Sequence, residues 1–141
     1  MEIQSFSEPY RAEVIQLWRD TGLVAPQNDP NKDINRKMAD SPQWFFIGIA
    51  DKHVVASVMA GYDGHRGWVN YLAVQPALQK QGLAQQLMTH VEHQLRAVGC
   101  AKINLQIRDT NLQVITAYKA MGYDIDPVTS MGKRLISDQP K

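Results

Sequence analysis

The stretch that decides the fold reads Tyr71-Leu72-Ala73-Val74-Gln75-Pro76-Ala77-Leu78-Gln79-Lys80-Gln81-Gly82-Leu83-Ala84. It starts as an apolar strand, passes through a loop marked by Pro76 and enters a helix whose first turn carries no carboxylate. A helix N-terminus has unpaired backbone N–H groups and about half a positive charge, so it can hold a phosphate without a broad basic surface. Gly82 lets an anion approach the backbone, and Lys80 adds a cation. The stretch therefore predicts a phosphate-binding turn.

Other phosphate-binding classes and large charged partners do not fit the sequence. It contains neither G-x-x-x-x-G-K-[ST] nor G-x-G-x-x-G, which argues against a kinase, a GTPase or a nicotinamide dehydrogenase. Lysine and arginine total 15 against 14 acidic residues, so no nucleic-acid partner is expected. The apolar run Trp44 to Ala50 is too short to cross a bilayer, so no membrane partner is expected. The lone Cys100 demands no oxidising compartment, and the expected location is cytoplasmic.

Outward from this stretch, hydrophobic periodicity predicts a mixed α/β domain that occupies residues 1–141. Helices are expected from Pro9 to Gly22, after the Asp29-Pro30 cap, over 82–98 and after Asn111. Strands are expected over 2–6, 44–50, 53–62, 68–74 and 102–108, with a final hairpin over 123–135. Asp51-Lys52 is typical of a two-residue hairpin turn, so the middle strands should form an antiparallel meander. The element order is β-α-α-β-β-β-α-β-α-β-β.

The same stretch resembles the GNAT family of acyl-CoA-dependent N-acyltransferases. Gln79 to Ala84 matches the family signature [RQ]-x-x-G-x-[GA], and Leu72-Ala73-Val74-x-Pro76 looks like its fourth strand. Asn111, followed seven residues later by Tyr118 and then by Met121-Gly122-Tyr123, is similar to its second motif. The resemblance covers nearly the whole chain. It implies the GNAT fold, a mixed and mostly antiparallel sheet flanked by helices, with acetyl-CoA as acyl donor and no metal.

The resemblance also implies a role for particular residues. Main-chain groups of Leu72, Ala73 and Val74 would hold the acetyl carbonyl and the pantetheine arm. The pyrophosphate of coenzyme A would be wrapped by Gln79, Lys80, Gln81, Gly82, Leu83, Ala84 and Gln85. Asn111 would contact the cofactor, the Val74 N–H would polarise the thioester carbonyl, and the Tyr118 hydroxyl would protonate the departing sulfur.

The general base is not assigned by the resemblance. In the ribosomal-protein N-acetyltransferase branch a glutamate lies five residues before the motif asparagine, and this sequence has Gln106 there. An amide cannot accept a proton at neutral pH. Three alternatives stay open: a chain of water molecules, the carboxylate of Asp63 and the imidazole of His65.

The expected activity is transfer of an acetyl group from acetyl-CoA to a primary amine by direct attack, because no convincing cysteine or serine nucleophile is present. The expected partners are a coenzyme A thioester and an amine of a small molecule or a protein, with homodimer formation left open. Mixed charge over residues 26–41 permits a zwitterionic acceptor without selecting one. The alternative is a non-catalytic acyl-CoA-binding sensor or interaction module, which the missing glutamate would suit.

Overall fold

One five-stranded sheet, in the order β1-β2-β3-β4-β5, organises the chain, and the computed structural model describes residues 1–139. The first four strands are antiparallel to their neighbours, whereas β5 runs parallel to β4. The domain expected over 1–141 thus includes two residues that lie outside the described part. The strands are β1 (Glu2–Ser5), β2 (Phe45–Ala50), β3 (His53–Tyr62), β4 (Gly67–Val74) and β5 (Ile103–Leu105).

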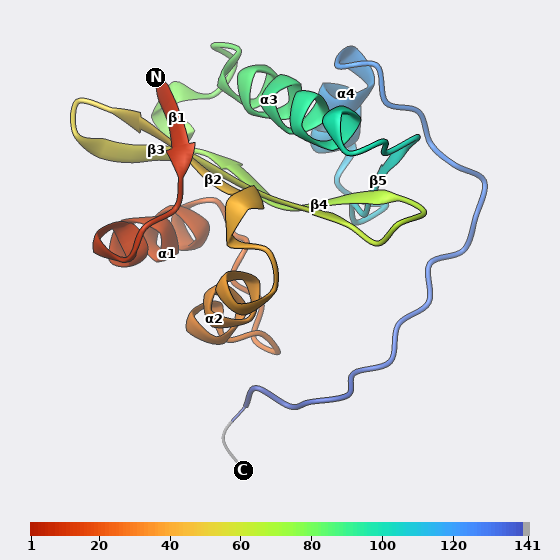
Figure 1. The fold of residues 1–141 in the computed structure, drawn as a ribbon, viewed down its shortest axis with the longest axis horizontal. Coiled ribbons are helices and arrows are strands. Elements are labelled where there is room, and N and C mark those ends of the chain that lie inside the picture. The colour runs from red at the N-terminus through yellow and green to blue at the C-terminus, as the bar shows by residue number, and fades with distance from the viewer. Residues whose placement is uncertain (140–141) are drawn as a thin grey trace.

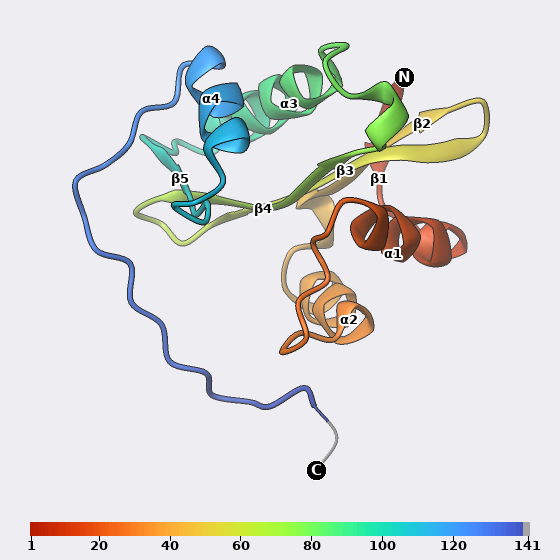
Figure 2. The same cartoon turned by 180° about the vertical axis from the view of Figure 1, so that it is seen from behind.

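Helices cover both faces of the sheet (Figures 1 and 2). One face carries α1 (Arg11–Asp20) and α2 (Pro30–Asp40), and the other carries α3 (Leu83–Ala97) and α4 (Leu112–Ala120). Short 3-10 turns occupy Glu8–Tyr10, Pro42–Trp44 and Pro76–Leu78. Each face has its own apolar core, because successive strand residues point to opposite sides of a sheet. Ala73 belongs to the cluster under α1 and α2, and Val74 to the cluster under α3 and α4.

Three local signals in the sequence are confirmed by the structure. The Asp29 carboxylate accepts hydrogen bonds from the backbone N–H groups of Asn31 and Lys32, which caps α2. Asp51 and Lys52 both have positive φ, +50° and +67°, as a two-residue hairpin with the twist of its strands requires. The Asn111 side chain accepts a hydrogen bond from the Val114 N–H and caps α4.

The predicted final hairpin over 123–135 is wrong. Residues 124–139, called the tail below, form no strand and run as an extended segment from α4, past the outer side of β5, to the end of the molecule near α2 (Figures 1 and 2). Their apolar side chains are exposed, with Val128 at 78% and Met131 at 91%, and Pro127 removes a backbone donor. Strands in this segment would have no buried face to cover. The strand expected over 102–108 is likewise shortened to Ile103–Leu105.

Candidate active site

A crevice opens where β4 and β5 part. The two strands pair from Gly67 with Ile103 to Val69 with Leu105, and beyond this the described residues include no β5 partner for β4. Residues 70–74 of β4 therefore present a free sheet edge in the middle of the molecule. An unpaired edge offers backbone donors and acceptors to an extended ligand, as a strand would.

A bulge bends β4 at the start of this crevice. Tyr71 and Leu72 together face Val58 of β3, and Tyr71 has φ +54°, a left-handed value that costs about 1–2 kcal/mol in a residue with a Cβ. The Tyr71 ring stacks on Trp18 of α1 with centroids 3.9 Å apart. Buried Ser57 accepts a hydrogen bond from Trp18 Nε1 at 2.9 Å and donates one to the Tyr71 carbonyl at 2.8 Å. These contacts hold the strained residue in place.

The backbone of Val74 faces the crevice. The Gln75 N–H donates to the Val55 carbonyl at 2.8 Å, so Val55 and Gln75 form a hydrogen-bonded pair of the antiparallel ladder. The next pair, Ala56 with Val74, is then a non-hydrogen-bonded one, and the Val74 N–H and C=O point away from β3. The Gln79 side-chain amide donates a hydrogen bond to the Val74 carbonyl at 3.2 Å. The Val74 N–H is left for a ligand.

The loop before α3 has a run of backbone N–H groups without described protein partners. Lys80 and Gly82 have φ of +63° and +83°, so the backbone turns through left-handed positions around the helix start. The first intrahelical bond of α3 runs from the Gln86 N–H to the Gly82 carbonyl at 3.1 Å. The N–H groups before it, those of Lys80, Gln81, Gly82, Leu83, Ala84 and Gln85, are available. Successive N–H groups in such a turn form an anion-binding concavity.

Tyr118 of α4 lies in the apolar cluster that also contains Val74. Its ring meets the Tyr123 ring edge-on, with centroids 5.6 Å apart, and the residue is 9% exposed. Burial raises the pKa of the Tyr118 hydroxyl, so the group stays protonated at neutral pH. The Tyr118 hydroxyl forms no hydrogen bond with any group of the described residues. In that part of the chain, every fully buried side-chain oxygen or nitrogen has a hydrogen-bond partner, so the unbonded Tyr118 hydroxyl must reach solvent. Asn111, at the start of the same helix, uses its side-chain oxygen as the cap.

Asp63 and His65 lie elsewhere. Both belong to the turn between β3 and β4, and eight-residue β4 separates that turn from Val74 by roughly 20 Å. Three donors occupy the Asp63 carboxylate: the backbone N–H groups of His65 and Arg66, each at 2.7 Å, and Trp68 Nε1 at 3.2 Å. These hydrogen bonds lower the pKa of Asp63, the N–H of Arg66 most, and a lowered pKa opposes proton uptake. The structure therefore does not bring either residue near the Val74 N–H.

A cavity of about 490 Å³ lies between the α1–α2 connection and the end of β5. Residues from Gly22 to Asn28 line one side, Gln106 to Arg108 line the other, and Ser130 of the tail adds a hydroxyl. Its volume is in the range of small-molecule sites. The Gln106 amide, at the position of the expected general base, donates to Ser130 Oγ at 2.5 Å.

Sequence reasoning missed one pair beside the bulge. The Tyr71 hydroxyl donates to Asp33 Oδ2 of α2 at 2.6 Å, which places a partly exposed carboxylate beside the middle of β4. No local pattern marks this pair, because it joins a strand to a helix far away in the sequence. Within residues 1–139, no cluster of three or more metal-ligating side chains occurs, and no helix is both long and apolar enough to span a membrane.

Comparison with known proteins shows which family the chain matches. Residues 8–123 match the model of the acetyltransferase (GNAT) family. A protein of Yersinia enterocolitica named as an acetyltransferase is 42% identical over 139 residues, and another, of Sodalis glossinidius, is 44% identical over 140 residues. In both cases 99% of each chain is covered.

Solved structures share the fold at low sequence identity. The structure of Ard1 from Thermoplasma volcanium has a TM-score of 0.75 and 19% identity, over 89% of this chain and 83% of that one. AAC(6')-Iy, in complex with a bisubstrate analogue of coenzyme A, has a TM-score of 0.76 and 17% identity, over 95% and 98%.

The splayed parallel strand pair, the bulged central strand and the N–H-rich loop before α3 belong to a fold that this chain shares with these solved structures. The match of the family model and of relatives above 40% identity decides the family. The chain belongs to the GNAT family of acetyltransferases.

Proposed function

We propose that this acetyltransferase uses acetyl-CoA and moves its acetyl group to a primary amine by direct attack on the thioester. The observation that carries the proposal is the free edge of β4, continuous with the run of N–H groups from Lys80 to Gln85. An extended pantetheine arm can add to that edge, and a pyrophosphate suits the loop beyond it. A cytoplasmic location is part of the proposal, since the single cysteine demands no oxidising compartment.

Two groups would carry the chemistry. The Val74 N–H would donate to the thioester oxygen as negative charge builds on it during attack. The new C–N bond would form as the C–S bond breaks, and the Tyr118 hydroxyl would give its proton to the departing sulfur. Of the three alternatives for the base, we favour water for removing the proton from the attacking amine, since Asp63 and His65 lie at the other end of β4. Water would then return a proton to Tyr118.

The proposal is tested with the purified chain and acetyl-CoA. Calorimetry measures acetyl-CoA binding, and a thiol reagent follows coenzyme A release over a panel of amines while mass spectrometry identifies the acetylated product. We expect binding and amine-dependent thiol release. Binding without turnover on any amine would instead indicate the non-catalytic module, and absence of binding would contradict both.

A further inference from the structure

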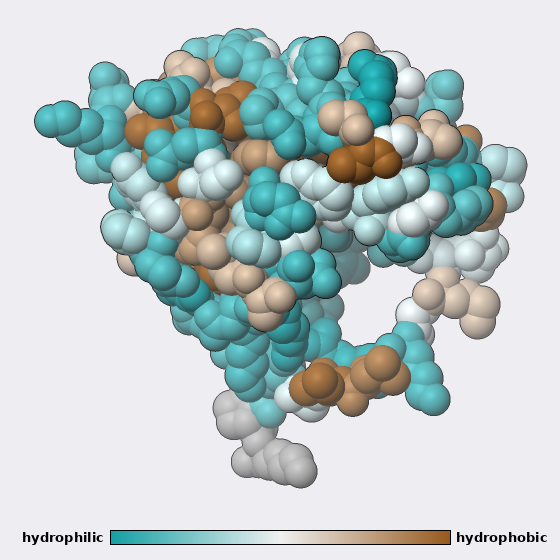
Figure 3. Space-filling model, viewed as in Figure 1, coloured by the Kyte–Doolittle hydropathy of each residue, from teal (hydrophilic) through white to brown (hydrophobic). Residues whose placement is uncertain are grey.

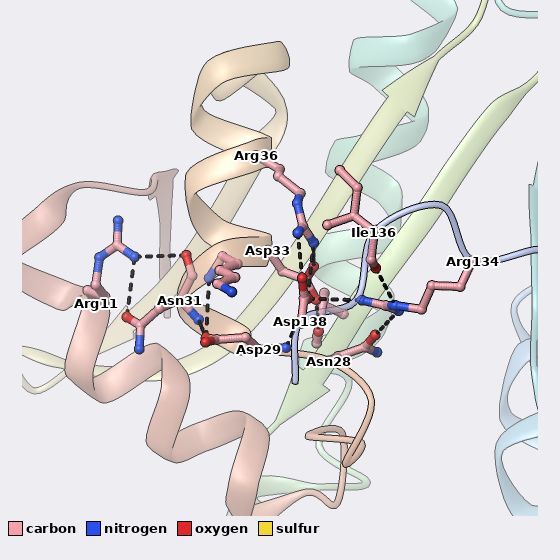
Figure 4. Close-up of polar contacts among 11 residues, drawn as sticks. Arg11, Asn28, Asp29, Asn31, Asp33, Arg36, Arg134, Ile136 and Asp138 are labelled. Atoms are coloured by element: carbon pink, nitrogen blue, oxygen red, sulfur yellow. Dashed lines mark hydrogen bonds and ion pairs between the residues drawn. The ribbon is translucent and has the colours of Figure 1, made fainter. Parts of the chain in front are cut away.

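Asp138 is the one buried residue of the tail. Its carboxylate is 1% exposed, although the tail residues around it are exposed. Arg36 of α2 donates to both of its oxygens, from Nη1 at 3.1 Å and from Nη2 at 2.5 Å. The Asp29 backbone N–H, at the start of α2, donates at 3.2 Å, and Arg134 Nη2 lies 3.0 Å away. Figure 4 shows these groups converging on the carboxylate from α2 and from the tail.

This arrangement is a complete receptor for a carboxylate. A guanidinium that meets both oxygens gives short, directional, charge-assisted bonds, and a helix N-terminus adds a favourable dipole. The hydrogen bonds from Arg36 lower the pKa of Asp138, so the surroundings favour its charged form. None of these donors recognises anything of Asp138 beyond its carboxylate. Another carboxylate of similar size could make the same contacts.

Near Asp138 the tail is held by polar contacts, which include hydrogen bonds from Arg134 to Asn28 and from Gln139 to the Pro26 carbonyl. The space-filling view shows an opening between the tail and the body of the molecule, with apolar residues exposed near the lower end of the tail (Figure 3). Leu135 and Ile136, next to the site, are 87% and 65% exposed and bury little surface. A hollow of about 360 Å³ lies beside Asp138, and Asn28 lines both this hollow and the cavity at the end of β5. The receptor therefore adjoins the cavity at the end of β5.

The receptor also adjoins a second carboxylate that faces β4. Arg36 Nη1 lies 3.2 Å from Asp33 Oδ1 while it contacts Asp138, so the two carboxylates share one guanidinium. The other oxygen of Asp33 accepts the hydrogen bond from Tyr71 in the bulge. A molecule whose carboxylate replaced that of Asp138 would have Asp33 within reach of a cationic group next to it. From the tail toward β4, the guanidinium of Arg36 thus comes first and the carboxylate of Asp33 second.

We propose that Arg36, Arg134 and the Asp29 N–H form the acceptor carboxylate site, that Asp138 occupies it in the free protein, and that the acceptor is a small zwitterionic amine such as an amino acid. The inference rests on the proposed transfer to an amine and names its substrate class. Asp33 receives the ammonium end of the acceptor on its way to the thioester. Exchange of one carboxylate for another conserves the contacts of the site, so the Asp138 side chain can be displaced without leaving Arg36 with an unpaired charge.

The first experiment compares matched amines. Thiol release is measured with L-alanine and L-alaninamide, and with β-alanine and β-alaninamide. We expect kcat/KM to be at least about tenfold higher for each acid, the ratio that 1.4 kcal/mol of binding provides. Amidation lowers the basicity of the amine and so raises its reactive fraction, which works against the expected preference. Equal rates for acid and amide would overturn the inference and leave the proposed acetyl transfer standing.

The second experiment changes the site. Arg36→Gln should lower kcat/KM for the acids by about 10- to 100-fold and leave the amides within about twofold, with partial recovery in Arg36→Lys, which keeps the charge but not the fork. Arg11→Gln is the matched control, because Arg11 also bonds α2, at Asn31 and Asn35, without touching the carboxylate site. Asp138→Asn should lower the KM for the acids severalfold, since it removes the competitor. A raised KM in that variant would overturn the exchange.

The third experiment needs no turnover. Backbone amide signals of Ser137 and Asp138 are followed by NMR while glycine is added at millimolar concentration. We expect the signals to move toward their positions in Asp138→Ala, and glycinamide to leave them in place. Displacement without any acetyl transfer would contradict the proposed function alone, whereas unmoved signals would overturn the carboxylate site.

Discussion

The hydroxyl of Tyr71 in the bulge of β4 donates a 2.6 Å hydrogen bond to the carboxylate of Asp33 on α2. The bond ties α2 to the strand that would hold the acetyl group in the proposed function. Because Tyr71 also has a left-handed backbone, its side chain must compensate for local strain. The geometry of the crevice and the position of α2 therefore depend on each other.

Replacing Tyr71 by phenylalanine should lower the free energy of unfolding by about 1–2 kcal/mol, since a hydrogen bond to a charged group is lost while the ring stacking on Trp18 remains. Urea denaturation measures the change. Tyr62→Phe is the control, because its hydroxyl donates to the Gly64 carbonyl at 3.2 Å on the surface. We expect that variant to stay within about 0.5 kcal/mol of the parent. Equal losses in the two variants would contradict a special role for the Asp33 bond.

Replacing Ser57 by alanine should be more costly. Fully buried Trp18 would lose the only acceptor that its indole N–H has among the described residues, and the Tyr71 carbonyl would lose a donor. An unsatisfied buried polar group costs about 1–3 kcal/mol, to be read as a loss of unfolding free energy in urea. Ser130→Ala removes an exposed hydroxyl from the tail and should leave the stability within about 0.5 kcal/mol. A neutral Ser57→Ala variant would show that water replaces the hydroxyl.

Two glycines that flank α3 separate the cofactor role from backbone strain. Gly82 and Gly99 have φ of +83° and +86°, and a Cβ on either one would meet no atom within 4 Å. Alanine at either position should lower the unfolding free energy by a similar amount, about 1–2 kcal/mol. Only Gly82→Ala should weaken acetyl-CoA binding, by about tenfold or more, as measured by calorimetry. Equal affinities in both variants would contradict a pyrophosphate at this loop.

Tyr118→Phe tests the proposed acid. We expect kcat to fall by about 10²- to 10³-fold with little change in acetyl-CoA affinity, as for removal of a general acid. Tyr123→Phe is the control, because the Tyr123 hydroxyl donates to Glu92 at 2.7 Å and is not proposed to act. Burial raises the pKa of Tyr118 above its ordinary value of about 10, so its ionisation should not reduce kcat of the parent between pH 7 and about pH 9. An unchanged kcat in Tyr118→Phe would exclude the role.

The attachment of the tail should depend on acid. Because the pKa of Asp138 is lowered in the folded state, chiefly by Arg36, the attachment is fully present above the ordinary aspartate pKa of about 4. It weakens as the pH falls below that value toward the lowered one. Asp138→Asn lacks the charge at every pH. The attachment of the tail should therefore differ between the parent and this variant at pH 7 and become the same in strong acid. Hydrogen exchange at Ser137 and Asp138 measures this, and a difference that persists unchanged into strong acid would contradict the pairing.

The sequence predicted what local signals encode. The Asp29 cap, the Asp51-Lys52 turn and the glycine before α3 each act within a few residues of chain, and the structure has all three. The apolar periodicity of α3 likewise predicted its length within a residue or two, since a helix with one buried stripe needs no distant partner to define it.

What escaped prediction depends on distant partners. The bulge at Tyr71 arises from the register of β4 against β3, and no residue within β4 predicts that register. Arg36 and Asp138 are 102 positions apart, and either one alone reads as an ordinary surface charge. The final hairpin was predicted from weak local signals, and its strands would have no face to bury. The loop proposed to hold coenzyme A was therefore readable from local sequence signals, whereas the carboxylate site proposed for the acceptor was not.

The strands of the sheet lie side by side in the same order as they occur in the chain. The antiparallel part can therefore assemble by successive short-range steps from β1 to β4, each closing a modest loop except the one around α1 and α2. β5 joins through only three residue pairs, and it does so after α3 has crossed the sheet. The β5 wall of the crevice should then be the last part of the sheet to form and the first to open in local unfolding. Bound coenzyme A would protect the amides of β5 from exchange more than those of β2.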